Sequence, residues 1–288
     1  DKVNEKLLEA RSSRIRPGLD DKSLTSWNAI MMIGLLDAYA AFNDDRFLEL
    51  AKKNANWIME YQVTDEGGLY HSYKEGVSKI DGFLEDYAFT ISASLKLYEA
   101  TFDEAFLNNA DKLMKYAIDH FFDEKSGMFF FTSSSGDDLI TRKMEINDNV
   151  IPASNSEMAR ALFKLGSFFD NQDYKDKASQ MLTNVYSDMS GYYSGYTNWG
   201  LLCMNMIQPY FEVAITGPGW EKKLAEMNQD YHPNKILMGG RQGGLPLLEG
   251  KFGDETTIYV CVNKACMRPV EEISDAVDQM GQWKKSDE

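Results

Sequence analysis

Carboxylate side chains cluster at the starts of apolar, helix-like stretches, where they are suited to proton transfer. Glu85 and Asp86 are adjacent at one such start, and Asp21 stands at another. Two carboxyl groups a few ångströms apart can act as general acid and general base at a glycosidic bond or in hydration chemistry. We therefore predict Asp86, Glu85 and Asp21 as catalytic residues.

The adjacency of Glu85 and Asp86 also predicts how they titrate. Like charges this close raise the pKa of one carboxyl group, whereas the amide groups of a helix start lower the pKa of the other. We expect an Asp86→Asn variant to lose catalysis with little loss of stability, because Asn also caps helices well. An Ala variant is expected to lose about 1 kcal/mol more.

Side chains that could contact a ligand stand beside these carboxylates or at equivalent helix starts. Trp27 is an aromatic residue at a helix start, where it could stack on a sugar ring. Arg142 lies on a predicted hairpin strand, where its guanidinium could bind a carboxylate or a phosphate. The predicted substrate-binding residues are Trp27, Asn28, Tyr87, Arg142, Asn155 and Ser156.

A structural interpretation of the same residues stays open. Asp21, Asp86 and either Ser154 or Asn155 are of the residue types preferred at helix N-caps. Trp27 is equally suited to a core, since Trp is highly buried on average. Charged strand residues more often face solvent than a ligand.

Histidine and metal chemistry have few candidate residues. The three histidines are His71, His120 and His232, and a mechanism that uses a pair of histidines is not expected from so few. His71 lies on a hairpin that could reach the helix starts. A zinc site needs about four ligands at familiar spacings. No metal and no cofactor is therefore predicted.

Two of the three cysteines form a spaced pair. Cys261 and Cys266 flank the end of a predicted strand. Free structural thiols, a disulfide or redox pair, and metal ligands all stay open for these two residues. Cys203 lies in an apolar helical stretch and is expected to be an ordinary buried thiol.

The helix starts recur along the chain, and this repeat decides where the candidate residues can meet. The clusters at 20–28, 84–88 and 152–157 lie about 65 to 70 residues apart. Their free N–H groups and positive dipole ends are expected to gather on one rim. Hydrophobic periodicity predicts inner helices at 24–42, 84–101, 154–169 and 198–207, outer helices at 46–62, 103–121 and 174–188, and β-hairpins at 67–81 and 127–145.

The sequence pattern changes after residue 208. We predict a mainly α fold with a helical-hairpin repeat domain over 1–208 and a small α/β appendage over 209–288. Apolar inner helix faces left uncovered predict self-association or an open concave face. The appendage is expected to contain strands at 211–216, 235–238 and 257–262, helices at 220–229 and 270–280, and a Gly-rich loop at 239–244.

Composition excludes several partner classes. The 288 residues are 43% hydrophobic and carry a net charge of −15, with a pI near 4.7. Such an acidic chain repels phosphate backbones, so no nucleic-acid partner is expected. The longest apolar run, 29–36, is far shorter than the roughly 20 residues needed to span a membrane. We expect a cytoplasmic protein. Because the chain begins with Asp1, we also expect a fragment of a longer polypeptide.

Several motifs in this sequence resemble one known family in order and approximate spacing. They extend over nearly the whole chain. The motifs are Arg14-x-Arg16-Pro17-x-x-Asp20-Asp21-Lys22-x-x-x-x-Trp27-Asn28, Leu84-x-Asp86-Tyr87-Ala88, Leu97-Tyr98-Glu99-Ala100-Thr101, Arg142-Lys143, Asp148-x-x-x-Pro152-x-x-Asn155-Ser156, and Val260-Cys261 followed by Cys266 and Pro269-Val270. Together they resemble the C-terminal half of thioredoxin-domain-containing proteins of the spermatogenesis-associated protein 20 type.

The resemblance implies a fold. It implies a partial (α/α)6 toroid, similar to six-hairpin glycosidases and N-acylglucosamine 2-epimerases, without the family's N-terminal thioredoxin-like domain and first toroid half. Smaller departures are Gly18 where His is commoner, and Ala153-Ser154 where Ser-Gly is typical.

The resemblance also implies two classes of function. The first is a carbohydrate-binding or carbohydrate-active domain, glycosidase-like or epimerase-like and enzymatic only when complete, with a sugar or sugar phosphate as ligand. The alternative is a non-catalytic interaction scaffold for a thioredoxin-like redox domain. The expected partners are that domain, the missing toroid half, or a second copy of the chain.

Overall fold

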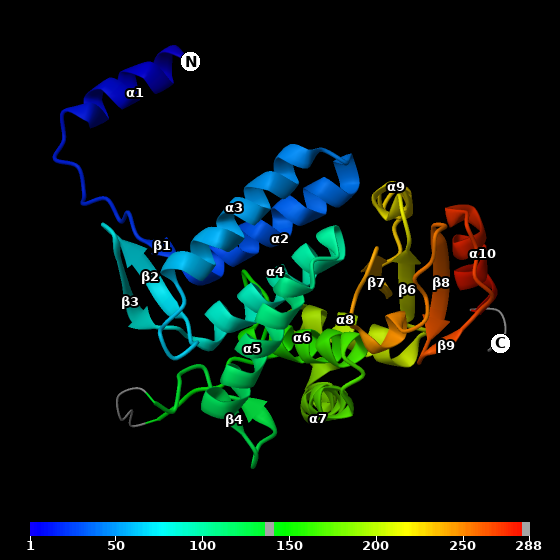
Figure 1. Ribbon diagram of the computed structural model, residues 1–288. Coiled ribbons are helices and arrows are strands. Elements are labelled where there is room, and N and C mark those ends of the chain that lie inside the picture. Colours follow the sequence, from blue (N-terminus) through cyan, green and yellow to red (C-terminus); the bar gives the residue numbers. More distant parts are fainter. Residues whose placement is uncertain (136–140, 284–288) are drawn as a thin grey trace.

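The computed structural model describes residues 1–135 and 141–283 and places four inner helices side by side, with three outer helices behind them (Figure 1). Each outer helix packs against the inner helix that precedes it, and neighbouring inner helices pack against one another in chain order. The predicted mainly α fold of helical hairpins is therefore confirmed. The inner helices are α2 (Thr25–Phe42), α4 (Leu84–Thr101), α6 (Ser154–Phe168) and α8 (Thr197–Ile207); the outer helices are α3 (Asp45–Tyr61), α5 (Glu104–Phe121) and α7 (Gln172–Met189).

Two small sheets connect the hairpins. β1 (Ser23–Leu24), β2 (Tyr70–Lys74) and β3 (Val77–Asp81) form an antiparallel sheet in that order. β4 (Phe122–Asp123) pairs with β5 (Met128–Phe129). The first predicted hairpin is thus confirmed.

The second predicted hairpin is wrong in its pairing. Residues 141–145 form no strand, and Leu139 and Ile140 lie outside the described residues. The backbone N–H of Phe131 still donates to Lys143 O at 2.7 Å, so the two segments touch without forming a ladder. The aromatic residues at the end of α5 pair with β5 instead, because this buries Phe129 against the helix layer.

The outer helices cap themselves, as their sequences indicate. Asp44, Asp103 and Asn171 are N-cap residues, and each side chain accepts a hydrogen bond from a backbone N–H of the first turn. These caps are exposed and local. The first residue of each outer helix is therefore set by a capping residue next to it in the sequence.

The inner helices are capped differently. Their N-cap residues are Leu24, Phe83, Ala153 and Tyr196, none of which caps through its side chain. The interpretation of Asp21, Asp86 and Ser154 or Asn155 as N-cap residues is therefore wrong, because residues with apolar or aromatic side chains occupy the cap positions.

Carboxylates from other segments supply the missing acceptors. Asp148, in the segment before α6, is 7% exposed. Its Oδ1 accepts from Ala153 N at 2.9 Å and from Ser156 Oγ at 2.7 Å. Its Oδ2 accepts from Asn198 N, at the start of α8, at 2.8 Å. One buried side chain therefore connects the starts of two inner helices.

The C-terminal part is a small sheet with strand order β7-β6-β8-β9, in which only β6 and β7 are parallel. The predicted loop at 239–244 is partly wrong, since Gly239 and Gly240 end β7. A Cβ on Gly239 would lie 1.8 Å from Ile215 O, so only glycine allows this approach. The elements are β6 (Phe211–Thr216), α9 (Trp220–Met227), β7 (Lys235–Gly240), β8 (Thr257–Val262), β9 (Ala265–Cys266) and α10 (Ile273–Trp283).

The sheet packs against the helical hairpins. Glu99 of α4 accepts from Leu237 N at 3.2 Å, and the rings of Phe102 and Trp220 are 4.7 Å apart. The predicted domain boundary at 208/209 falls between α8 and β6.

Apolar side chains stay exposed on the first and last inner helices. On α2, Trp27 is 66% and Met31 61% exposed, and on α8 Leu201, Met204 and Ile207 are each more than half exposed. A cavity of about 710 Å³ lies along α8. This agrees with the expected open inner faces. What covers them stays a prediction.

The N-terminal helix α1 (Lys2–Ser12) was not predicted and extends away from the other helices (Figure 1). None of its residues is buried. Among the described residues, no helix is both long enough and apolar enough to cross a membrane.

The two kinds of cap predict different losses of stability. Asp148→Ala should lower the free energy of unfolding by about 3 kcal/mol or more, because it leaves the buried amides of Ala153 and Asn198 without an acceptor. Asp103→Ala, at an exposed outer cap, should cost about 1 kcal/mol. Urea unfolding measures both. Equal losses would contradict the role we give to Asp148.

Candidate functional site

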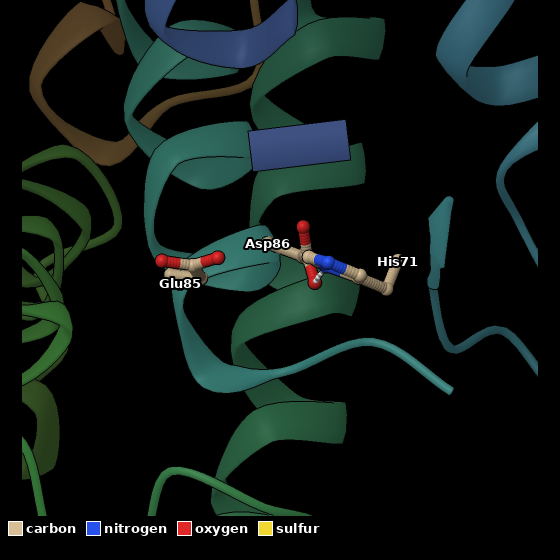
Figure 2. A group of neighbouring side chains, drawn as sticks. All are labelled: His71, Glu85 and Asp86. Carbon is tan, nitrogen blue, oxygen red and sulfur yellow. Dashed lines mark hydrogen bonds and ion pairs between the residues drawn. The ribbon is translucent and has the colours of Figure 1, made fainter. Parts of the chain in front are cut away.

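The candidate site lies at the rim where the starts of α2 and α4 meet strand β2. Ser26 and Trp27 belong to the first turn of α2, Glu85 and Asp86 to the first turn of α4, and His71 to β2. Figure 2 shows Asp86 between the imidazole of His71 and the carboxylate of Glu85. The rim therefore brings together two adjacent carboxyl groups of α4 and one imidazole of β2, next to the first turn of α2.

Local packing brings β2 to the start of α4. The hydroxyl of Thr25 donates to Tyr70 O, which fixes β2 on the first turn of α2. Gly82 N donates to Leu69 O at 2.7 Å, and a Cβ at Gly82 would also lie 2.7 Å from that oxygen. Glycine thus allows the chain to turn tightly from β3 into α4, next to Tyr87.

Asp86 is fully buried and all its hydrogen-bonding partners are within the chain. Its Oδ1 accepts from Ser26 N at 2.9 Å. Its Oδ2 accepts from Phe83 N at 2.9 Å and lies 2.9 Å from His71 Nδ1. Asp86 therefore joins the starts of α2 and α4 and orients the imidazole, in the way that Asp148 joins α6 and α8.

The pKa values of this pair follow from burial and from their mutual hydrogen bond. The hydrogen bond to Asp86 raises the pKa of His71 above its ordinary value, against the effect of burial. Burial raises the pKa of Asp86, while the bonds from His71, Phe83 N and Ser26 N oppose that rise. The His71 ring also packs edge-on against Phe83, with centroids 4.8 Å apart.

Glu85 differs from Asp86 because it keeps an oxygen for other partners. Its side chain is half-buried, and its Oε1 accepts from Ser26 Oγ at 3.3 Å. Within residues 1–135 and 141–283, no hydrogen bond reaches Oε2. Burial raises the pKa of Glu85, and the nearby charges of Asp86 and Glu145 raise it further. The expectation that one pKa of the pair would fall is therefore wrong, because burial outweighs the amide groups.

Sequence reasoning missed Glu145. Its Oε2 accepts from Ser154 N at 3.0 Å, at the start of α6, and its charge acts on Glu85 across the rim. The sequence placed it at the end of the second predicted hairpin, where the structure forms no strand, and gave it no functional role. Only the arrangement of α4 beside α6 makes the two glutamates neighbours.

His71, Glu85 and Asp86 are also potential metal ligands. One ligand atom from each lies within 4.8 Å of the others. Two ligands bound to one ion at about 2.1 Å can be at most about 4.2 Å apart. Asp86 already accepts two amide N–H groups, so Glu85 would have to move for all three to bind. The residues as placed fit proton transfer better than metal binding.

Other predicted site residues lie near this rim but are engaged elsewhere. Asp21 is exposed and pairs with Lys74 at 2.6 Å; this hydrogen bond lowers the pKa of Asp21. The hydroxyl of Tyr87 accepts from Leu69 N at 2.9 Å, and its ring stacks on Tyr116. Asn28 donates to Leu24 O at 2.8 Å.

The remaining predicted residues stabilise the start of α6 and the preceding loop. Asn155 Oδ1 accepts from Phe129 N at 2.8 Å, and its amide donates to Phe129 O and Glu145 O at 2.9 Å. Ser156 donates to Asp148 at 2.7 Å. Arg142 donates to Thr132 O and His120 O and lies 4.2 Å from the centre of the Phe130 ring. The polar groups of these three side chains therefore make hydrogen bonds within the chain.

Below the rim, polar side chains link the inner helices in sequence. Lys96 of α4 pairs with Asp37 of α2, and Glu99 of α4 pairs with Lys164 of α6 at 3.3 Å. Glu85, Ser92, Lys96 and Glu99 follow one another along α4 at spacings of seven, four and three residues. These spacings place all four side chains on one face of the helix. Asp37, Glu157 and Lys164 contact these α4 side chains directly. Arg160 pairs with Glu157 and donates to Asn198, which extends the chain of contacts to α8.

The contacts of Asp86 revise what its variants should do. Asp86→Asn should lower the free energy of unfolding by about 2 kcal/mol, because one oxygen is replaced by an NH₂ that faces a buried donor. Asp86→Ala should cost about 3 kcal/mol or more. Denaturant unfolding measures both. A nearly neutral Asn variant would support the simple capping role expected from the sequence.

The raised pKa of His71 predicts a pH-dependent contribution to stability. The charge-assisted bond to Asp86 is fully present below the unfolded pKa of about 6.5 and is lost as the pH rises through the higher folded value. A His71→Gln variant keeps a donor but does not titrate. The difference in melting temperature between wild type and this variant should therefore shrink with rising pH. A constant difference between pH 5.5 and 8.5 would contradict this.

Comparison with curated proteins finds distant relatives. No family model matches the chain. The chain is 29% identical to human spermatogenesis-associated protein 20 over 92% of its own length and 37% of that protein. It is 30% identical to an uncharacterised protein of Caenorhabditis elegans over 62% of this chain and 25% of that one. The chain thus spans about a third of the length of the curated relatives it matches.

Solved structures resemble the chain in fold alone. The GH76 α-mannanase of Bacteroides thetaiotaomicron has a TM-score of 0.49 and 19% identity, covering 61% of this chain and 46% of that one. The cellobiose 2-epimerase of Bacillus thermoamylovorans has a TM-score of 0.49 and 16% identity, covering 57% and 44%. The sequence comparison identifies the chain, over most of its length, as a distant homologue of spermatogenesis-associated protein 20.

Proposed function

We propose that the rim binds a neutral carbohydrate and that Glu85 donates a proton to a glycosidic oxygen of the bound sugar. The observation that carries this proposal is the state of Glu85. It is half-buried, its pKa is raised, and its Oε2 has no hydrogen bond within the described residues. A carboxyl group that holds its proton nearer to neutral pH is what a general acid needs.

Trp27 supplies the apolar part of the proposed site. It is 66% exposed and follows Ser26, whose hydroxyl contacts Glu85. An exposed aromatic ring on the helix turn that contacts Glu85 suits the apolar face of a sugar ring, which carries C–H groups. Its exposure argues against the core role that the sequence left open.

Glu145 is the candidate for the second carboxylate. The amide of Ser154 holds one of its oxygens, and its charge acts on Glu85. Glycosidic hydrolysis needs a proton donor and a second, ionised carboxylate. An epimerase mechanism with two histidines is less well supported, because only His71 of the three histidines stands at this rim.

The charges near the site favour a neutral sugar over a sugar phosphate. Four lysine and arginine side chains around the rim and on the polar face below it are paired with carboxylates. These pairs are Lys74–Asp21, Lys96–Asp37, Arg160–Glu157 and Lys164–Glu99. A phosphate would have to displace a carboxylate from one of them, which makes anion binding unfavourable.

The proposal concerns the site, and the relatives are about three times as long as this chain. We expect turnover in a polypeptide of that full length, where further chain can complete the binding surface. Sugar binding at Trp27 is expected already in the present chain, because its ring is exposed here.

Glu85→Gln and Trp27→Ala test the two roles separately. Glu85→Gln should lower hydrolysis of the oligosaccharide that binds by about 100-fold or more, since it removes a general acid, with little change in affinity. Trp27→Ala should weaken binding by about tenfold. Calorimetry with a panel of neutral oligosaccharides and release of reducing ends are the measurements.

Matched controls are available on the outer helices. Glu60→Gln removes an exposed glutamate of α3, and Tyr186→Ala removes an exposed aromatic ring of α7. Both variants should behave as wild type. Unchanged binding in Trp27→Ala, or full turnover in Glu85→Gln, would contradict the proposal.

A second candidate is the non-catalytic interaction scaffold. It is favoured by the hydrogen bonds of Asp86, Asn155 and Tyr87, whose side-chain polar atoms bond to other groups of the same chain. Under this alternative no oligosaccharide in the panel binds, at either chain length. The same calorimetry therefore separates the two candidates.

A further inference from the structure

A second group of reactive side chains lies in the C-terminal sheet, away from the rim. Cys261 of β8 and Cys266 of β9 form a disulfide, which settles the alternatives left open by the sequence. Cys203 is the free cysteine, and it is partly buried in α8. The proposed carbohydrate function uses none of these residues.

The disulfide and a buried carboxylate form one row across three strands. Glu212 of β6 is paired with Cys261 of β8, and Cys261 is paired with Cys266 of β9. Directly opposed residues of antiparallel strands point to the same face and have Cβ atoms about 5 Å apart. Glu212 is therefore the cross-strand neighbour of the disulfide, on the face where the bond lies.

The two cysteine residues differ sharply in exposure. Cys261 is 0% exposed, whereas Cys266 is exposed on the short edge strand. A thiolate has to reach a disulfide sulfur along the S–S axis for exchange to occur. An external thiol can therefore attack Cys266, with Cys261 as the leaving group inside the protein.

Glu212 is placed to handle the proton of that leaving group. It is 4% exposed, and its Oε2 accepts from Lys264 N, in the turn between β8 and β9, at 2.9 Å. Burial raises the pKa of Glu212, and the charge of Asp170 also raises it. The hydrogen bond from Lys264 N and the charges of Lys175 and Lys264 lower it. Lys264 also pairs with Asp170 at 2.7 Å.

We propose that Cys261, Cys266 and Glu212 form a thiol–disulfide exchange site whose substrate is an external dithiol, with Glu212 as the proton donor to Cys261. This site is independent of the proposed carbohydrate function. Its evidence is the register of three strands, the exposure of one sulfur and the burial of the carboxyl group beside the other.

The exchange balances with a dithiol as the reductant. One thiolate of the dithiol attacks Cys266 Sγ; an S–S bond to the dithiol forms and the Cys261–Cys266 bond breaks. Cys261 leaves with the electron pair and takes the proton of Glu212. The second thiolate then attacks the dithiol's own sulfur in the mixed disulfide and releases Cys266 as a thiolate. The dithiol is oxidised and the cysteine pair is reduced.

Reduction would also loosen the hairpin that carries Cys266. β9 has two residues and pairs with β8 alone. A cavity of about 530 Å³ lies between this hairpin and the end of α8, lined in part by Val262, Asn263 and Ala265. The disulfide therefore controls one wall of that cavity.

Alkylation and mass spectrometry of the native chain test the proposal. With dithiothreitol at neutral pH, the 261–266 bond should open while the fold persists, and it should re-form when the reductant is removed. Glu212→Gln should slow the opening by about tenfold or more, because the variant has no proton to give. Gln keeps an acceptor for Lys264 N, so the hairpin should stay in place.

Two controls make the result decisive. Glu271→Gln changes an exposed glutamate of the same region and should leave the rate unchanged. If Glu212→Gln lowers the melting temperature strongly, Glu212→Asp, which keeps the proton, should react faster than the Gln variant. A bond that opens only on unfolding, or an unchanged rate in Glu212→Gln, would overturn the proposal.

Discussion

The amide groups at the starts of the inner helices lie in apolar surroundings, where each needs an acceptor that water does not provide. Asp148 provides it from the segment before α6, and Asp86 from the first turn of α4, for the start of its own helix and for that of a neighbouring inner helix, at distances of 2.8 to 2.9 Å. The outer helices, exposed to solvent, use their own N-cap side chains. Each buried carboxylate therefore fixes how two helix starts meet, and the arc of inner helices depends on these two contacts.

This constraint also separates structural from reactive carboxylates. Asp86 faces buried amides and His71, so its oxygens are committed to the fold. Glu85, one residue earlier on the same turn, lies about 100° around the helix and keeps an oxygen for other partners. Its raised pKa follows from the burial and negative charge that Asp86 and the rim impose. The proposed chemistry at Glu85 is thus a consequence of the structural role of Asp86.

The proposed exchange site in the sheet follows the same physical principle with a different reactive group. Glu212 is a buried carboxyl group that accepts a hydrogen bond from one backbone amide; the half-buried Glu145 at the rim also accepts from one backbone amide. In each case the surroundings decide whether a carboxyl group caps, donates a proton or stays ionised. The two sites lie on different elements, the rim of the helical hairpins and the far strands of the sheet, and each can be tested without the other (Figure 1).

The sequence by itself determined the helices after α1, the inner or outer position of those in the hairpins and the change to a sheet near residue 208, because hydrophobic periodicity is a local property. It also located Glu85, Asp86 and Trp27 at helix starts. It did not determine the N-caps of the inner helices, the pairing of β5 or the role of Glu145, since each depends on how the segments between the helices pack against the helix starts. Only the tertiary structure decided that both oxygens of Asp86 are hydrogen-bonded whereas Glu85 Oε2 has no partner among the described residues, and that Glu212 stands beside a disulfide. Those facts depend on register and helix packing, which a local pattern does not contain.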